Sequence, residues 1–374
     1  RGAVISGVAG KPVATLADFQ QAVAGLADGA RVTLRYTTLE NPTGSETRVM
    51  RMDRRWFAAR ECRRDDQTGL WPCRDLREAP QAEAPAPART SFVTTGDALA
   101  DRLAPSLVLV NYTMPFSVAG VTERNYHGTG LVVDAARGLV AVDRNTVPVA
   151  VGDVRLTFAG SVEVPGRVEY VHPLHNVTIV SFDPKLLDGT PIRSATLDPR
   201  ELLPGESVVV VGMNGDSRVR SIATTVASVD DVSFPLSRTL QFREANLEVA
   251  RLVNGPSDLD GVIVGSDGRV RALWSSFAVE AGREVSQVNR GLPVELVAEA
   301  VAAVKEARPL YSLEVEFEAV PISQARKLGL PEAWVQRFES AGDVHRQVLS
   351  VARVVAGSPA EELLREGDLL LAVG

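Results

Sequence analysis

The segment Leu203-Pro-Gly-Glu-Ser-Val-Val-Val-Val-Gly212 contains a Pro-Gly turn followed by an apolar run one strand long. β-Branched residues favour extended backbone, and Pro-Gly marks a turn. From residue 91 to about residue 288, further short apolar runs alternate with turns, and no long helical pattern intervenes. Strands at roughly 8–12-residue spacing predict a β-barrel or a β-sandwich. The predicted strands include Gly130–Val133, Leu139–Val142, Val154–Phe158, Val168–Val171, Thr178–Phe182, Ser207–Gly212, Val262–Val264 and Val270–Trp274.

One amphipathic helix is predicted directly after these strands. Pro293 suits the first turn of that helix, and Val294, Val297, Val301 and Val304 recur at helical spacing as its buried stripe. The predicted centre of the chain is therefore a mainly β domain that ends in a helix.

The first 52 residues are predicted to form a strand, a helix and two more strands. Thr15 and Asp18 form a capping box in front of apolar residues at helical spacing, and Gly29 is expected to close the helix. Leu34 and its alternating neighbours continue as a strand. Residues 77–90 are rich in Pro, Ala and charge without apolar periodicity, which predicts a semi-extended linker.

Residues 309–374 begin with alternating apolar residues around Val315. Ser358 is a predicted N-cap with Pro359 as the first helical residue, and a strand is expected over Leu369–Val373. This end of the chain is therefore also predicted to mix helices and strands.

Composition excludes several classes of protein. Apolar residues make up 45% of the 374 residues, enough to bury a core, and a chain of this length is expected to hold two or three domains. The net charge of −7 gives no electrostatic reason to bind nucleic acid. No apolar run approaches the ~18–20 residues that span a bilayer. Cys62 and Cys73 lack the second pair of a structural zinc site, and one disulfide or two free thiols both fit them.

Four motifs occur in a fixed order within residues 100–308. They are His127-Gly-Thr-Gly-Leu-Val-Val-Asp134, Leu203–Gly212, Val264-Gly-Ser-Asp-Gly-Arg-Val-Arg-Ala272 and Gly291-Leu-Pro-Val294. Together they resemble the chymotrypsin-like double β-barrel of the HtrA/Deg-type serine proteases, a family that carries PDZ domains. The strings Val8–Phe19 and Gly357–Gly374 are similar to the second half and the first half of a bacterial-type PDZ domain.

The resemblance implies that the chain is a fragment that starts inside one PDZ domain and stops inside another. The region that joins the first PDZ-like segment to the protease-like domain contains Asp65-Asp66 and Gly69-Leu-Trp71. This joint looks most like that of the long fungal and plant branch with two protease domains. In that branch the second protease domain is degenerate, and this chain resembles that second domain. The implied order is the C-terminal part of a PDZ domain (1–57), a joint and linker (58–90), a degenerate trypsin-like domain (91–308) and the N-terminal part of a following PDZ domain (309–374).

The catalytic residues of the family are missing from the matching positions. Serine peptidolysis needs a general base, a carboxylate that orients it, and a nucleophile beside backbone donors. The position of the base, within Ala141–Val147, holds Asn145, whose amide cannot accept and return a proton near neutral pH. The position of the orienting carboxylate, within His172–Val180, holds Asn176, which supplies no charge.

The position of the nucleophile is predicted to hold Leu259. Counting back from the Asp267-Gly268 turn without a gap gives Leu259, and a two-residue slip gives Ser257. In the second case Asp258 would stand beside the developing oxyanion, where it is unfavourable. The chain is therefore predicted to be catalytically inactive, and an active serine endopeptidase with Ser257 as nucleophile is the alternative.

The four histidines are not expected to replace the missing base or to bind a metal. His172 and His175 flank Asn176 at the predicted start of a strand, where residues three apart point to opposite faces. His127 precedes a Gly-Thr-Gly turn, and His345 lies in the PDZ-like end. Surface or loop positions are expected for all four, with no metal and no cofactor.

PDZ domains capture an extended peptide by strand addition, and backbone N–H groups receive its carboxylate. The loop that matches this site consists of Tyr311, Ser312, Leu313, Glu314 and Val315. Glu314 replaces a glycine of the family, and its charge beside a carboxylate is unfavourable by ~1 kcal/mol or more. Peptide capture and a purely structural docking role therefore both remain open.

Three functions follow from these patterns. The first is an inactive module of a larger ATP-independent protease in protein quality control, which serves oligomerisation, substrate holding or regulation. The second is the active endopeptidase, and the third is a peptide-binding scaffold. Expected partners are unfolded or C-terminal peptide segments, other domains of the same protein and further copies of the chain. Relatives of this type are described from the nucleus and from plastids, and the sequence does not choose between the two.

Overall fold

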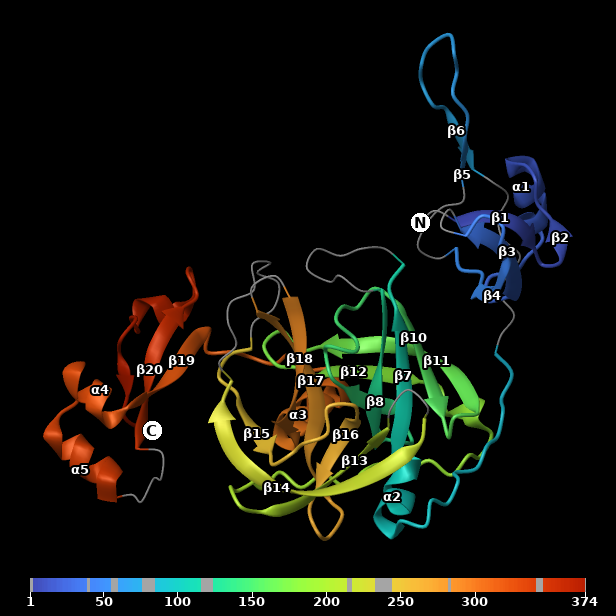
Figure 1. Ribbon diagram of the computed structural model, residues 1–374. Coiled ribbons are helices and arrows are strands. Elements are labelled where there is room, and N and C mark those ends of the chain that lie inside the picture. Colours follow the sequence, from blue (N-terminus) through green and yellow to red (C-terminus); the bar gives the residue numbers. More distant parts are fainter. Residues whose placement is uncertain are drawn as a thin grey trace. The chain divides into compact units, whose positions relative to one another are not determined.

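The computed structural model describes residues 3–38, 41–54, 60–75, 85–115, 124–213, 217–232, 244–281, 284–340 and 346–373. The chain divides into two compact units, Arg1–Ala86 and Pro87–Gly374 (Figure 1). The first unit holds a small sheet with one helix. The second holds two β-barrels and a further small sheet.

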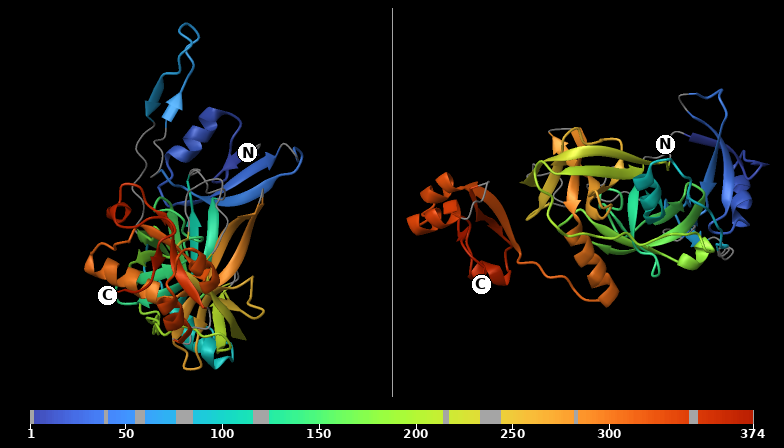
Figure 2. Two further views of the ribbon diagram at one scale, coloured as in Figure 1. Left: turned by 90° about the vertical axis from the view of Figure 1, so that its left-hand side faces the viewer. Right: turned by 90° about the horizontal axis from the view of Figure 1, so that it is seen from below.

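The sheet of the first unit is antiparallel and has the order β2-β1-β3-β4. Helix α1 (Leu16–Ala24) packs on β1 (Figure 2). The predicted capping box is confirmed, since Thr15 Oγ1 accepts the Asp18 N–H and the Asp18 carboxylate accepts the Thr15 N–H at 2.8 Å. The strands are β1 (Ala3–Val8), β2 (Lys11–Pro12), β3 (Arg31–Thr38) and β4 (Glu46–Arg51).

The predicted end of α1 is wrong. Gly25, rather than Gly29, is the C-cap residue. Arg54 donates to the carbonyl of Val23 in the last turn of the helix and to that of Leu26 just beyond it, so both groups have a partner without a longer helix. Gly29, with φ +83°, turns the chain into β3.

A short hairpin follows the small sheet. Its strands are β5 (Arg60–Cys62) and β6 (Cys73–Asp75), and Cys62 lies directly opposite Cys73. The two cysteines form a disulfide, which answers a question that the sequence left open.

The two closed six-stranded barrels confirm the predicted chymotrypsin-like double β-barrel. The first has the order β10-β11-β12-β9-β8-β7, with β7 (Leu107–Thr113), β8 (Asn125–Asp134), β9 (Leu139–Val142), β10 (Asp153–Phe158), β11 (Val162–Val171) and β12 (Thr178–Phe182). The second has the order β13-β14-β15-β18-β17-β16, with β13 (Ser207–Met213), β14 (Val219–Asp231), β15 (Glu248–Leu252), β16 (Asp260–Val264), β17 (Val270–Ala281) and β18 (Glu284–Pro293).

Short helices flank the barrels. Helix α2 (Ala98–Leu103) and the 3₁₀ turn η1 (Ala104–Ser106) precede β7, and η2 (Pro184–Leu187) follows β12. The predicted terminal helix is α3 (Val294–Glu306). Pro293 is its N-cap residue rather than a residue of its first turn.

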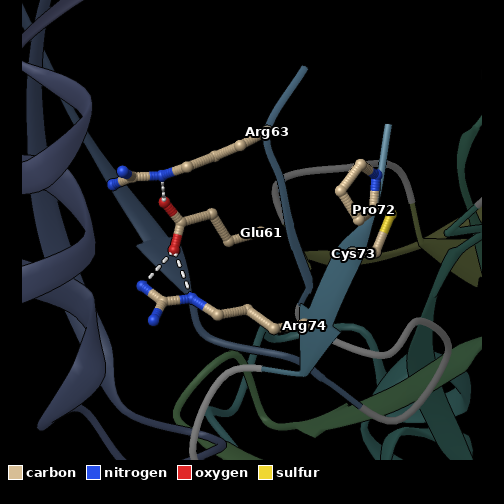
Figure 3. Close-up of a pocket in the computed structure, with 5 residues that line it drawn as sticks. All are labelled: Glu61, Arg63, Pro72, Cys73 and Arg74. Atoms are coloured by element: carbon tan, nitrogen blue, oxygen red, sulfur yellow. Dashed lines mark hydrogen bonds and ion pairs between the residues drawn. The ribbon is translucent and has the colours of Figure 1, made fainter. Parts of the chain in front are cut away.

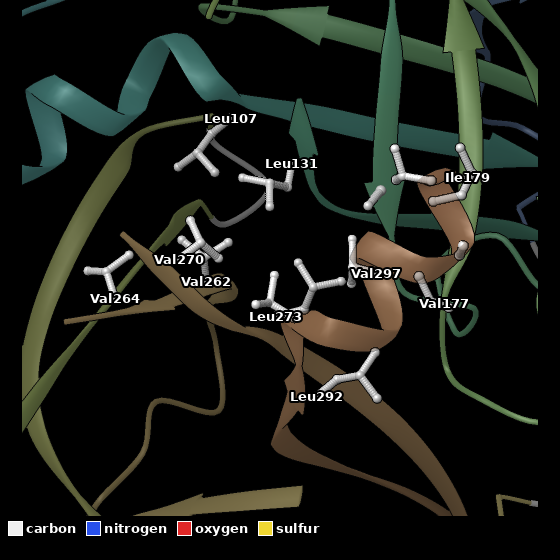
Figure 4. Packing of buried hydrophobic residues seen from close by; sticks show 14 of the residues in the cluster. Leu107, Leu131, Val177, Ile179, Val262, Val264, Val270, Leu273, Leu292 and Val297 are labelled. Carbon is white, nitrogen blue, oxygen red and sulfur yellow. The ribbon is translucent and has the colours of Figure 1, made fainter. Parts of the chain in front are cut away.

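One apolar cluster joins both barrels to α3 (Figure 4). Leu131 and Ile179 enter it from the first barrel, Val262 and Leu273 from the second, and Val297 from α3. All five side chains are at least 97% buried. At ~25 cal/mol per Å² of apolar surface, such burial is the main force that holds the barrels together.

The C-terminal sheet has the order β19-β20-β21. The structure corrects two expectations here. Ser358 makes no capping hydrogen bond with its side chain; instead Glu361 accepts the Gly357 N–H at 2.8 Å. The last strand covers two residues rather than Leu369–Val373. The elements are β19 (Val315–Pro321), α4 (Ile322–Lys327), α5 (Glu332–Ser340), β20 (Gln347–Val354), η3 (Pro359–Glu362) and β21 (Leu369–Leu370).

None of the helices in the described part of the chain is long and apolar enough to cross a bilayer.

Candidate active-site region

Asn145 and Asn176 lie side by side in the first barrel. Asn145 follows β9, and Asn176 precedes β12, which pairs with β9. Asn176 Oδ1 accepts the backbone N–H groups of Arg144 at 2.8 Å and of Asn145 at 3.2 Å. A single amide oxygen therefore anchors the turn that carries Asn145.

Ser276, on β17 of the second barrel, binds both amides. Asn145 Nδ2 donates to Ser276 Oγ at 2.8 Å, and Asn176 Nδ2 donates to the Ser276 carbonyl at 2.8 Å. The two carboxamides thus form a closed network across the barrel interface. Neither amide can take up a proton near neutral pH, so neither Asn145 nor Asn176 can act as a general base.

Two carboxyl groups lie next to this network, Asp143 buried and Asp260 partly buried. Asp143 accepts the N–H of Thr146 at 2.7 Å and the N–H of Ser276 at 3.0 Å, and burial raises its pKa. Burial and the nearby Asp143 raise the pKa of Asp260 to about 7. A hydrogen bond from Asn289 to Asp260 Oδ1, at 3.3 Å, acts against this rise. Sequence reasoning missed this pair, because only the fold brings β9 and β16 together.

Leu259 is buried in the core of the second barrel, with 3% of its surface exposed. It packs in one cluster with the buried Trp274, whose indole N–H donates to the Pro256 carbonyl at 2.9 Å. Ser257 is exposed in the turn before β16. The position predicted for the nucleophile therefore holds a core side chain, and its neighbour Asp260 is the residue that interacts with Asp143.

The histidine pair beside Asn176 lies in a turn, so the prediction of a strand there is wrong. His172 Nδ1 accepts the N–H groups of Leu174 and His175, which folds the segment back and places the two rings 4.6 Å apart. Both rings are buried. Burial lowers the pKa of His172 to about 4 and also lowers that of His175, so both are neutral at physiological pH. Within the described ranges, no three His, Cys, Asp or Glu side chains cluster as metal ligands.

The other two histidines add nothing to the described amide network. His127 is exposed on β8, and His345 lies outside the described residues.

Glu244 is a further, partly buried acid that the sequence did not single out. Its carboxylate accepts the Asn176 N–H, and Oε2 has no hydrogen-bond partner. Burial raises the pKa of Glu244 to about 8, and the nearby Arg144 guanidinium limits that rise. Segments that precede β12 and β15 therefore meet at Asn176.

No protein-family model matches the chain. The chain is 33% identical over 386 residues to the "Pro-apoptotic serine protease NMA111" of Pyricularia oryzae, and the match covers 99% of this chain and 37% of that protein. It is 31% identical over 389 residues to a PDZ domain-containing protein of Schizosaccharomyces pombe, covering 99% of this chain and 38% of that protein. The chain belongs to the HtrA/Deg-type serine protease family.

The HtrA-type chain spans less than two fifths of the length of these relatives. A solved structure with a similar fold is the "HtrA-type protease AlgW with tripeptide", which is 16% identical with a TM-score of 0.49 and covers 72% of this chain and 80% of that one.

The predicted peptide-binding loop of this HtrA-type chain precedes β19. Tyr311 and Leu313 are exposed, at 91% and 73%, whereas Val315 is buried and begins the strand. Glu314 has φ +57°, a conformation that suits the glycine of the family, and its N–H donates to Ser312 Oγ at 3.0 Å.

A shallow pocket of about 450 Å³ lies on the β5–β6 hairpin (Figure 3). Glu61 accepts from Arg63 at 2.7 Å and is paired with Arg74. These two arginines hold the pKa of Glu61 below its usual range. Among the described residues that line this pocket, Glu61, Arg63 and Arg74 are paired with one another.

Proposed function

We propose that the chain is a catalytically inactive, protease-like module of a longer HtrA-type serine protease, with partial PDZ domains at the boundaries predicted above. In that protein it serves oligomerisation, substrate holding or regulation. The observation that carries the proposal is the closed network of Asn145, Asn176 and Ser276, beside which Leu259 is a core residue.

The hydrogen bonds of this network support inactivity more strongly than a missing side chain alone. Ser276 Oγ accepts from Asn145 and donates to Asp143 Oδ2 at 3.2 Å, so the one serine hydroxyl in the network faces a buried acid and an amide. An amide cannot activate a hydroxyl as a base does. Neither neutral buried histidine, His172 or His175, has a serine hydroxyl as a hydrogen-bond partner in the described structure.

The tests are covalent labelling of the folded 374-residue chain with a fluorophosphonate probe and, on a separate unlabelled sample, incubation with unfolded casein. We expect no labelling and no release of peptides, because Asn145 and the buried acid Asp143 hold the Ser276 hydroxyl, and no described histidine is bonded to a serine hydroxyl. Trypsin is the positive control for both assays. Stoichiometric phosphonylation of any serine would contradict the proposal.

The second candidate is an active serine endopeptidase, favoured by the serine protease names of the relatives. Ser257 is the nucleophile that this function requires, and it is exposed. Substitution Ser257→Ala separates the two candidates. Only the active enzyme loses peptide release on this substitution, whereas the inactive module has none to lose.

A further inference from the structure

The free edge of β19 carries an unusual contact. β19 pairs with β20 along one edge, from Val315 opposite Val354 to Pro321 opposite Gln347. Among the described strands, none pairs with its other edge. There Asn246, which precedes β15, donates from Nδ2 to the Val315 carbonyl at 2.7 Å and accepts the Phe317 N–H on Oδ1 at 2.8 Å.

These two hydrogen bonds use the groups that an added strand would need. A strand edge offers its N–H and C=O groups to a neighbour in alternation, and Val315 and Phe317 are two residues apart. A carboxamide carries the same donor and acceptor as a backbone peptide unit. The Asn246 side chain therefore takes the place of one peptide unit of a pairing strand.

The segment that presents Asn246 is held on both sides. Leu247 is buried, and its carbonyl accepts the Val232 N–H at 2.7 Å. Glu244 accepts the Asn176 N–H. Asn246 itself has φ +53°, which asparagine tolerates better than most residues. The carboxamide is thus positioned for the strand edge before any partner arrives.

We propose that Asn246 is an intramolecular competitor for the strand-adding edge of β19. The competing ligand is an extended segment of unfolded polypeptide, recognised through its backbone, which must displace the carboxamide to pair with Val315 and Phe317. This inference deepens the substrate-holding role proposed above and rests on it. A peptide strand would pair with the edge through several peptide units, whereas Asn246 offers a single side-chain amide. Asn246 therefore weakens peptide binding without preventing it.

The first test is hydrogen exchange of the Phe317 N–H in Asn246→Gly. Glycine removes the carboxamide and keeps the left-handed backbone unstrained. Asn254→Gly is the matched control, since Asn254 is also exposed and left-handed, with φ +51°, but follows β15. We expect the Phe317 N–H to exchange about tenfold faster or more in Asn246→Gly and at the wild-type rate in Asn254→Gly. Equal rates in all three proteins would overturn the proposal.

The second test is the affinity for fluorescein-labelled decapeptides that tile the β-casein sequence, measured by fluorescence anisotropy. Asn246→Gly should bind at least one decapeptide about tenfold more tightly than wild type, whereas Asn254→Gly should not. Free-acid and C-terminally amidated versions distinguish carboxylate capture from recognition of an internal segment. Equal affinities, or no binding by any variant, would overturn the competitor role. Whether the chain is catalytically inactive is tested separately, by fluorophosphonate labelling. The outcome of that labelling does not depend on Asn246.

Discussion

At the scale of single residues, Asn176 shows how one side-chain amide can hold the turn that carries Asn145. Its amide oxygen accepts two backbone N–H groups, as a carboxylate would, and its amide nitrogen finds a carbonyl on the other barrel. The local turn is therefore satisfied, while no negative charge remains to stabilise an imidazolium.

Asp260 is expected to make stability depend on pH. Its pKa in the fold, about 7, lies above the ordinary value of 3.8, so the fold favours the neutral acid. The contribution of neutral Asp260 to the free energy of unfolding is complete below pH ~4 and is lost as the pH rises through ~7. In Asp260→Asn this loss should disappear, so that at pH 8 the variant exceeds wild type in free energy of unfolding by roughly 2–4 kcal/mol.

Urea denaturation at pH 4, 6 and 8 checks this prediction. Asp258→Asn, an exposed neighbour, is the control and should follow the wild-type profile. Because Asp143 also has a raised pKa, a smaller decline should remain in Asp260→Asn. Parallel profiles for wild type and Asp260→Asn would contradict the raised pKa of Asp260.

At the scale of secondary-structure elements, the β5–β6 hairpin is too small to be stable without a cross-link. Two strands of three residues bury little surface, and the Cys62–Cys73 disulfide closes the loop between them. A bridge across a loop of this size contributes on the order of 2–3 kcal/mol. Cys62→Ser with Cys73→Ser should therefore open the hairpin locally.

Limited trypsin digestion with mass spectrometry measures that opening. Cleavage after Arg63 and Arg64 should become at least tenfold faster in the double variant, while β7 to β12 stay protected. Unchanged cleavage would show that Glu61 and its arginine partners hold the hairpin without the disulfide.

Strands and helices could be predicted where a local sequence pattern sets their ends. β9 and β12 have the predicted bounds, because apolar runs between turns define both ends. The capping box of α1 was equally local. The C-terminal end of α1 was not, since Arg54, far along the chain, binds the carbonyls of Val23 and Leu26.

At the scale of the whole molecule, Thr129 links the two barrels. Its hydroxyl donates to the Met213 carbonyl at 3.1 Å and accepts the Met213 N–H at 3.2 Å, in a buried setting. Thr129→Val keeps the shape of the side chain and leaves both backbone groups without this partner. It should lower the free energy of unfolding by about 1–3 kcal/mol.

Denaturation of Thr157→Val provides the comparison, because Thr157 lies on the half-buried outer face of β10. This control should stay within about 0.5 kcal/mol of wild type. Equal effects of the two substitutions would mean that the Thr129 contact adds nothing to the barrel interface.

The sequence by itself determined a β domain of short strands, the terminal helix and the amide at position 145, because periodicity, turn residues and residue type are local properties. The double barrel was predicted from the resemblance to the HtrA/Deg family. The tertiary structure alone decided that Ser276 closes the amide network, that Asp143 faces Asp260 and that Asn246 occupies the edge of β19. These contacts join residues 69 to 131 positions apart. Their geometry depends on how two closed barrels pack, and no local pattern carries that information.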